Sequence, residues 1–310
     1  MQDVDLLHLQ QGGKAELSRA LSRLERGPED PAVVALLDEA WRTPRGIIWG
    51  ITGPPGVGKS TLVGALIARL RSRGLRVAVI AVDPSSRHSG GALLGDRIRF
   101  MADPQDRDLY VRSMAARDRL GGLADLTWSA AILMRALYDR VIVETVGVGQ
   151  SETDVAGLAD SILFCVQPGS GDSLQFMKAG IMEIPHVAAV TKADSGAQAR
   201  RALKDLRGAL SLAEAEEGWT VRYLACSAVS GEGLDDLEAA LEAHSEWLQQ
   251  QGRLEAKRQR QADEWVANSL REDYGRLGWA RILDEEDKVE EAAPFTRRLR
   301  LRSRMDAFFR

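Results

Sequence analysis

Hydrophobic residues along this chain fall into two patterns, short continuous runs and helically spaced positions. Seven runs are candidates for strands, and most of them are short, nearly all-apolar and separated by helical segments. Such runs are typical of parallel strands that are covered on both faces. The pattern predicts an α/β fold with a mostly parallel sheet. The runs are GIIWGIT (46–52), RVAVIAV (76–82), LYVRS (109–113), RVIVET (140–145), SILFCV (161–166), HVAAVT (186–191) and VRYLAC (221–226).

The two ends of the chain carry helical patterns instead. KAELSRALSRLERG has apolar positions at helical spacing, and PAVVALLDEAWR starts with a proline, which suits a first helical turn. From Glu242 on, the chain is charged and helical, and it ends in the basic stretch TRRLRLRSRMDAFFR, whose role the sequence leaves open. We therefore expect an N-terminal helical extension (1–44), an α/β core (45–241) and a C-terminal helical extension (242–310).

Composition narrows the class of protein only a little. The 310 residues are 45% apolar, ample for a core, and the net charge of −4 argues against a basic surface that recruits nucleic acid. The start MQDVDLLHLQQGG lacks the features of a signal peptide, and no apolar run nears the length of a membrane span. Cys165 and Cys226 lie in apolar runs, so we expect buried free thiols. The expectation is a cytoplasmic protein with no membrane or nucleic-acid partner.

The segment GPPGVGKST, here called the phosphate loop (53–61), indicates the chemistry. It matches the pattern G-x-x-x-x-G-K-[ST] between a predicted strand and a predicted helix. Glycines let backbone N–H groups turn toward phosphate oxygens at the positive end of the helix. Lys59 is expected to reach the β- and γ-phosphates, and the Ser60 hydroxyl to ligate Mg²⁺. The predicted nucleotide contacts are Gly53, Pro54, Pro55, Gly56, Val57, Gly58, Lys59, Ser60 and Thr61.

A second motif follows the fourth run. RVIVE ends at Glu144, and Gly147 comes three residues later. In P-loop enzymes the acid at this strand end holds the Mg²⁺ shell, and the glycine N–H senses the γ-phosphate. No glutamine directly follows the glycine, because Val148 occupies that position, and Gln150 is displaced. We therefore expect slow hydrolysis until a partner reorganises the site.

Two further motifs predict the base that is bound. The TKAD loop (191–194) is similar to the guanine-recognising N-K-x-D motif, in which the acid accepts from guanine N1–H and the 2-amino group and the lysine lies along the base plane. Thr191 stands in place of Asn; it is shorter and lacks the amide, so its tether to the phosphate loop is open. The SAV loop (227–229) follows the last run, and its backbone N–H suits the guanine oxygen. In this order the motifs favour GTP over ATP. The predicted contacts are Thr191, Lys192, Asp194, Ser227, Ala228 and Val229.

Taken together, the motifs resemble one family, the methylmalonyl-CoA mutase-associated GTPases (the MeaB/ArgK group of the SIMIBI class of P-loop GTPases). The resemblance covers most of the chain and rests on GPPGVGKS, AVDPSS with GGALLGDR, ETVGVGQSE, PGSGD and TKAD. It implies that Asp83 and Asp96 lie around Mg²⁺ in a first switch loop and Glu144 in a second. It also implies that Lys178 lies in a third switch that communicates with a partner enzyme. The expected catalytic residues are Lys59, Asp83, Asp96, Glu144 and Lys178, and the expected metal ligands are Ser60, Asp83 and Glu144.

The resemblance also implies a function and a partner. Members of the family are homodimers with helical extensions, which makes 242–310 an expected dimerisation arm of the P-loop GTPase domain. They gate delivery of adenosylcobalamin to methylmalonyl-CoA mutase, protect or reactivate it, and hydrolyse GTP faster in its presence. Whether the partner here is methylmalonyl-, isobutyryl- or ethylmalonyl-CoA mutase stays open.

Two other functions remain as alternatives. A GTPase that inserts nickel or cobalt into another enzyme needs Cys/His ligand clusters, whereas the four histidines of this chain are scattered. A kinase that serves amino-acid transport needs a site for an acceptor hydroxyl, and TKAD would be unexplained if it used ATP.

Overall fold

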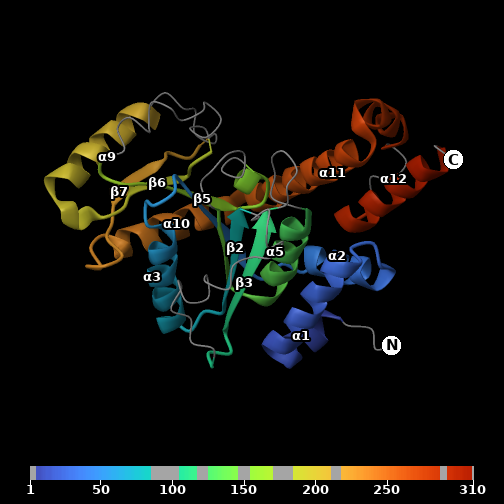
Figure 1. Cartoon of the computed structure of the whole chain (residues 1–310), viewed down its shortest axis with the longest axis horizontal. Helices are drawn as coiled ribbons and strands as arrows, with labels where there is room; N and C mark the ends of the chain where they lie inside the picture. The colour runs from blue at the N-terminus through green and yellow to red at the C-terminus, as the bar shows by residue number, and fades with distance from the viewer. Residues whose placement is uncertain are drawn as a thin grey trace. The chain divides into compact units, whose positions relative to one another are not determined.

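The chain folds into two compact units, each of which is described by itself (Figure 1). The computed structural model describes residues 5–84, 105–116, 125–145, 154–169, 184–210, 218–286 and 292–308. One unit comprises residues 47–124 and 138–254 and contains the sheet, and the other comprises residues 1–46, 125–137 and 255–310. The three consecutive domains expected from the sequence stay a prediction.

A seven-stranded parallel sheet forms the first unit, as the apolar runs predicted. The strand order is β3-β2-β4-β1-β5-β6-β7, and every pairing is parallel. β1 lies at the centre, between β4 and β5, so its carboxyl end is surrounded by neighbouring strand ends. The strands are β1 (Ile47–Thr52), β2 (Val77–Pro84), β3 (Leu109–Ala116), β4 (Arg140–Glu144), β5 (Ser161–Val166), β6 (Val187–Val190) and β7 (Arg222–Ala225).

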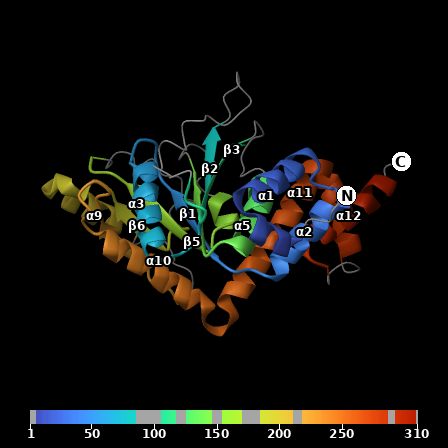
Figure 2. The same cartoon turned by 90° about the horizontal axis from the view of Figure 1, so that it is seen from below.

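Helices cover both faces of the sheet, because side chains alternate along each strand. Leu163 and Cys165 of β5 pack with α3 (Lys59–Ser72) and α10 (Leu234–Gln249). Phe164, between them in sequence, packs with α9 (Ala197–Leu210) on the opposite face. Figure 2 shows α3 and α10 side by side against the strands. Short 3₁₀ turns lie at η1 (Val155–Gly157), η2 (Ala193–Ser195) and η3 (Gln250–Gly252).

The second unit is helical, which confirms the helical patterns at both ends of the sequence. It contains α1 (Leu6–Arg26), α2 (Pro31–Arg42), α5 (Asp125–Leu137), α12 (Pro294–Phe308) and most of α11 (Arg253–Glu286). α1 and α11 bend at Gly13 and Gly275, which have positive φ angles of 65° and 68°. Trp128 of α5 stacks on Trp265 of α11 with ring centroids 4.3 Å apart. Every helix in the ranges given above is too short or too polar to span a lipid bilayer.

Ion pairs fix the basic C-terminal stretch within this unit. Arg297 Nη1 lies 2.6 Å from Asp263 Oδ1, and Arg298 Nη2 lies 3.5 Å from Asp273 Oδ2, both on α11. The buried carboxylate of Asp38 on α2 accepts from the N–H of Phe295 at 3.1 Å, at the start of α12. Much of the arginine-rich stretch therefore contributes to packing of the helical unit.

Candidate functional site

The phosphate loop joins the end of β1 to the start of α3. Gly53, Gly56 and Gly58 have φ angles of 140°, 76° and 96°, which residues with a side chain rarely adopt. Gly53 has a second constraint, because a Cβ there would lie 2.1 Å from the backbone oxygen of Cys165 in β5. α3 begins directly at Lys59. The loop thus leads into the start of a helix, where free backbone N–H groups favour an anion.

The side chain of Lys59 lies inside this loop. Its Nζ donates to the backbone oxygen of Gly53 at 2.6 Å and to that of Pro54 at 2.9 Å. The residue is only 6% exposed. A buried ammonium needs such acceptors, so the loop carries its own fixed positive charge.

The carboxylate of Glu144, at the end of β4, lies against the start of α3. Ser60 Oγ donates to Glu144 Oε1 at 2.6 Å, and Glu144 is buried. The sheet determines this position, since Glu144 pairs in register with Ile51 of β1 and Ala81 of β2. A hydroxyl and a carboxylate oxygen are donors that Mg²⁺ prefers. These two side chains therefore fit a magnesium ion.

Four other predicted residues lie partly or wholly outside this description. Asp83 belongs to β2, where its backbone pairs with Ala115, but its side chain is not among the described groups. Asp96, Gly147 and Lys178 lie outside the described residues. Their roles stay predictions.

Thr191 ties the TKAD loop to the phosphate loop. Its Oγ1 lies 2.6 Å from Val57 O and 2.9 Å from Val166 O, and the residue is 5% exposed. The hydroxyl has one hydrogen, so it donates to one carbonyl at a time. Because Thr191 N–H also donates to Val166 O at 2.8 Å, Val57 O is the acceptor that depends on the hydroxyl. A threonine hydroxyl thus makes the tether that the sequence left open.

Lys192 and Asp194 follow Thr191 in the TKAD loop. Lys192 has a left-handed backbone with φ of 56°, and its Nζ lies 3.4 Å from Gly56 O of the phosphate loop. Asp194 lies in η2 and is exposed. Within the described part of the chain, no hydrogen bond or ion pair engages its carboxylate. The carboxylate is therefore available to donors of a ligand.

The SAV loop lies beside the TKAD loop. Ala193 N–H donates to Cys226 O at 3.0 Å, which joins the TKAD loop to the residue directly before the SAV loop. Ser227 N–H donates to Glu232 O at 2.8 Å, so this amide is engaged within the protein. Val229 is 87% exposed. The loop thus presents its later residues, rather than Ser227 N–H, to a ligand.

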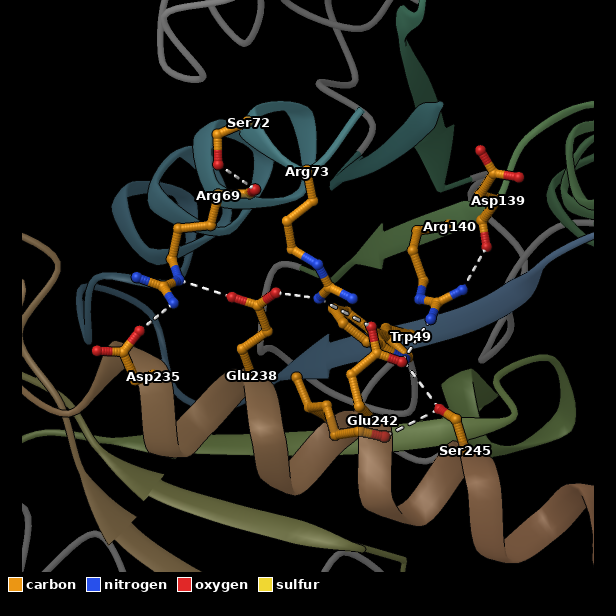
Figure 3. A network of polar contacts seen from close by, with 11 residues as sticks. Trp49, Arg69, Ser72, Arg73, Asp139, Arg140, Asp235, Glu238, Glu242 and Ser245 are labelled. Atoms are coloured by element: carbon orange, nitrogen blue, oxygen red, sulfur yellow. Dashed lines mark hydrogen bonds and ion pairs between the residues drawn. The ribbon is translucent and has the colours of Figure 1, made fainter. Parts of the chain in front are cut away.

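A network of ion pairs that no sequence motif predicted joins α3 to α10 (Figure 3). Glu238, 5% exposed, accepts from Arg69 Nε at 2.7 Å and pairs with Arg73. Burial alone would raise the pKa of Glu238, but hydrogen bonds from Arg73 and Arg69 outweigh it and hold the pKa below its ordinary value. On the same helix Glu242 pairs with Arg140 of β4. The network fixes the helix after the phosphate loop to the helix after the SAV loop.

Comparisons with known proteins match the chain to GTPases. The family described as "Methylmalonyl Co-A mutase-associated GTPase MeaB" matches residues 17–280. The chain is 38% identical over 300 residues to a putative GTPase of Caulobacter vibrioides, covering 94% of this chain and 88% of that protein. It is 38% identical over 227 residues to the mitochondrial methylmalonic aciduria type A homolog of Mus musculus, covering 72% of this chain and 55% of that protein. The solved structure of a LAO/AO transport system kinase is 28% identical with a TM-score of 0.68, covering 97% of this chain and 96% of that one.

Proposed function

The chain belongs to the MeaB family of methylmalonyl-CoA mutase-associated GTPases, and we propose that it uses GTP hydrolysis to gate cobalamin delivery to a cobalamin-dependent acyl-CoA mutase. We propose that it also protects or reactivates this mutase. The observation that carries the proposal is the junction of three loops. Thr191 links the TKAD loop to the phosphate loop, and Ala193 links it to Cys226, the residue directly before the SAV loop. The family description supplies the association with the mutase.

Recognition of the guanine base is proposed to depend on the two later loops. Asp194, exposed and without an internal donor among the described residues, would accept from guanine N1–H and the 2-amino group. Adenine offers no such pair of donors. The backbone N–H of Ala228 suits the guanine oxygen, because the preceding N–H of Ser227 is engaged with Glu232.

Hydrolysis is proposed to depend on groups held at the carboxyl end of β1. Negative charge spreads over the transferring phosphoryl group, and the ammonium of Lys59, buried in the phosphate loop, would stabilise that charge. Ser60 and Glu144, with Asp83, would hold Mg²⁺, which neutralises phosphate charge when bound. Asp96 and Lys178 complete the proposed catalytic set.

The partner is proposed to complete the site. Val148 directly follows Gly147 and has no group that orients a water molecule, so turnover of the protein alone is expected to be slow. A mutase that binds one arrangement of the switch segments better must reciprocally change nucleotide affinity. A cytoplasmic homodimer, with 242–310 as the dimerisation arm, is part of this proposal.

The test measures phosphate release from GTP and from ATP, with and without a cobalamin-dependent acyl-CoA mutase from the same cell. We expect preference for GTP, release of phosphate without any acceptor, and acceleration by the mutase that Lys178→Ala weakens more than it weakens GTP binding. Equal affinity for ATP would contradict the assignment of the base. Equal rates with every candidate mutase would remove the chaperone role and leave the GTPase standing, whereas transfer to an acceptor hydroxyl instead of release would favour a kinase.

Base recognition has its own test in Asp194→Asn. The substitution replaces one acceptor oxygen of the carboxylate by an NH₂ donor. The preference should therefore shift from guanine toward xanthine nucleotides, whose C2 oxygen accepts a hydrogen bond. The matched control is Asp205→Asn, an exposed acid on α9, which should leave preference unchanged. An unaltered preference in Asp194→Asn would show that another group selects the base.

A further inference from the structure

Gln167, the residue directly after β5, contacts the TKAD loop through its side chain. Its Oε1 accepts from Lys192 Nζ at 2.5 Å, and the residue is half-buried. The preceding residue, Val166, offers its backbone oxygen to both the N–H and the hydroxyl of Thr191. Two consecutive residues at the end of β5 thus hold two consecutive residues of the TKAD loop.

The ammonium of Lys192 is held between two acceptors. It lies 3.4 Å from Gly56 O, a long contact, and 2.5 Å from Gln167 Oε1, a short one. Lys192 is exposed, and a four-carbon stem has many rotamers, so its direction depends on a fixed acceptor. Gln167 is the nearer of the two, and its backbone directly follows the buried strand β5.

We propose that Gln167 is a positioning residue for guanine-nucleotide recognition. It holds Lys192 over the phosphate loop, so that the lysine stem lies along the base plane beside Asp194. The inference rests on the proposed GTP site, and none of the sequence motifs assigns Gln167 a role in base recognition. Gln167 acts through Lys192 and contributes no group to the chemistry.

A carboxamide suits this position chemically. Its oxygen accepts a hydrogen bond from an ammonium. Methionine has a similar length and lacks a strong acceptor, whereas glutamate keeps an acceptor at the same place. The pair Gln167→Met and Gln167→Glu therefore separates loss of the contact from loss of the side chain.

The experiment measures equilibrium binding of GDP and ADP, and GTP turnover, for wild type, Gln167→Met, Gln167→Glu, Lys192→Ala and the double variant Gln167→Met/Lys192→Ala. Gln167→Met should weaken GDP binding by about three- to tenfold, the effect of one hydrogen bond to a charged donor at a half-exposed site. Turnover at saturating GTP should stay unchanged, so the effect falls on KM and not on kcat. Gln167→Glu should bind GDP within about threefold of wild type. Combined with Lys192→Ala, Gln167→Met should cause no further loss.

Two results would overturn the inference. One is equal GDP affinity in wild type and Gln167→Met, and the other is an equal loss with and without Lys192→Ala. The control Gln198→Met alters an exposed glutamine on α9 and should change nothing. If wild type binds ADP as tightly as GDP, the proposed GTP site fails; if wild type prefers GDP and Gln167→Met binds it equally well, only the role of Gln167 fails. Thermal unfolding of each variant checks that it is folded.

Discussion

Replacing Thr191 by valine measures what the tether to the phosphate loop contributes. Valine keeps the branched shape of threonine and removes the hydroxyl, so the hydrogen bond to Val57 O is lost with little change in volume. Val166 O keeps its bond from the backbone N–H of residue 191. Position 191 is 5% exposed and Val57 is 1% exposed, so water replaces the lost donor poorly.

The free energy lost in Thr191→Val follows from these contacts. A buried acceptor left without a donor costs about 1–3 kcal/mol, and we take about 2 kcal/mol here. If the phosphate loop keeps its place, the cost appears as a lower free energy of unfolding of the nucleotide-free protein. If the loop shifts so that Val57 O reaches water, the cost appears as weaker GDP binding, up to about thirtyfold at 1.4 kcal/mol per factor of ten.

Urea unfolding of the nucleotide-free protein and calorimetric titration with GDP together measure both parts. The control Thr191→Ser keeps the hydroxyl and should retain GDP affinity within about threefold of wild type. A loss below about 0.5 kcal/mol in the sum of the two measurements for Thr191→Val would refute the reasoning, because the hydroxyl would then hold nothing in place.

Other residues give predictions of the same kind. Lys59→Ala removes the buried ammonium of the phosphate loop and should slow GTP hydrolysis by a factor on the order of 10²–10³ in a phosphate-release assay; undiminished turnover would exclude a catalytic role. Gly53→Ala puts a Cβ 2.1 Å from a backbone oxygen and should abolish GDP binding or folding, whereas Gly208→Ala on α9 meets open space and should stabilise the protein by about 0.5–1 kcal/mol in urea unfolding. Glu238 has a lowered pKa, so its ion pairs contribute fully above its ordinary value of 4.5 and are lost as pH falls through the folded-state value; the difference in unfolding free energy between wild type and Glu238→Gln should shrink below pH 4.5, and a constant difference would contradict this. Burial raises the pKa of Cys226 to about 12, so a thiol reagent at neutral pH should modify it only as the protein unfolds, and fast modification of the folded protein would show that it is accessible.

The strands were predictable from the sequence because burial on both faces leaves a local mark, a short apolar run. Their order was not, because no run carries a local pattern that indicates its neighbour in the sheet. The pairing of Gly50 with Val143 on one side and Ile162 on the other depends on chain segments far away in sequence. Gly50 also packs close to η1, where a Cβ would lie 2.6 Å from Val155, and no local pattern predicts that approach.

The site divides in the same way. The placement of Lys59, Ser60 and Glu144 was predictable, because each has a fixed spacing from a glycine loop or a strand end, whereas their roles toward a nucleotide stay predictions. The contact of Thr191 with Val57 joins residues 134 positions apart, and it depends on how closely two loops approach. Gln167 follows an apolar run, at the carboxyl end of the sheet where the other candidate site residues lie. Its contact with Lys192 depends on how the loops fold, so the sequence does not reveal it. The charges of the Glu238 network lie too far apart in sequence for helical spacing to reveal them.

The central place of β1 determines when this protein can become functional during its synthesis. β1 leaves the ribosome before either of its neighbours, β4 or β5, exists, so the phosphate loop is made long before the residues that hold it. The helical unit is completed later still, because Asp38 caps a helix that begins at Pro294. Such distant pairings close slowly and leave apolar strands uncovered meanwhile. Apolar surface of β1 therefore stays uncovered in the nascent chain until β4 and β5 have been made, and the helical unit is complete only after the helix that begins at Pro294.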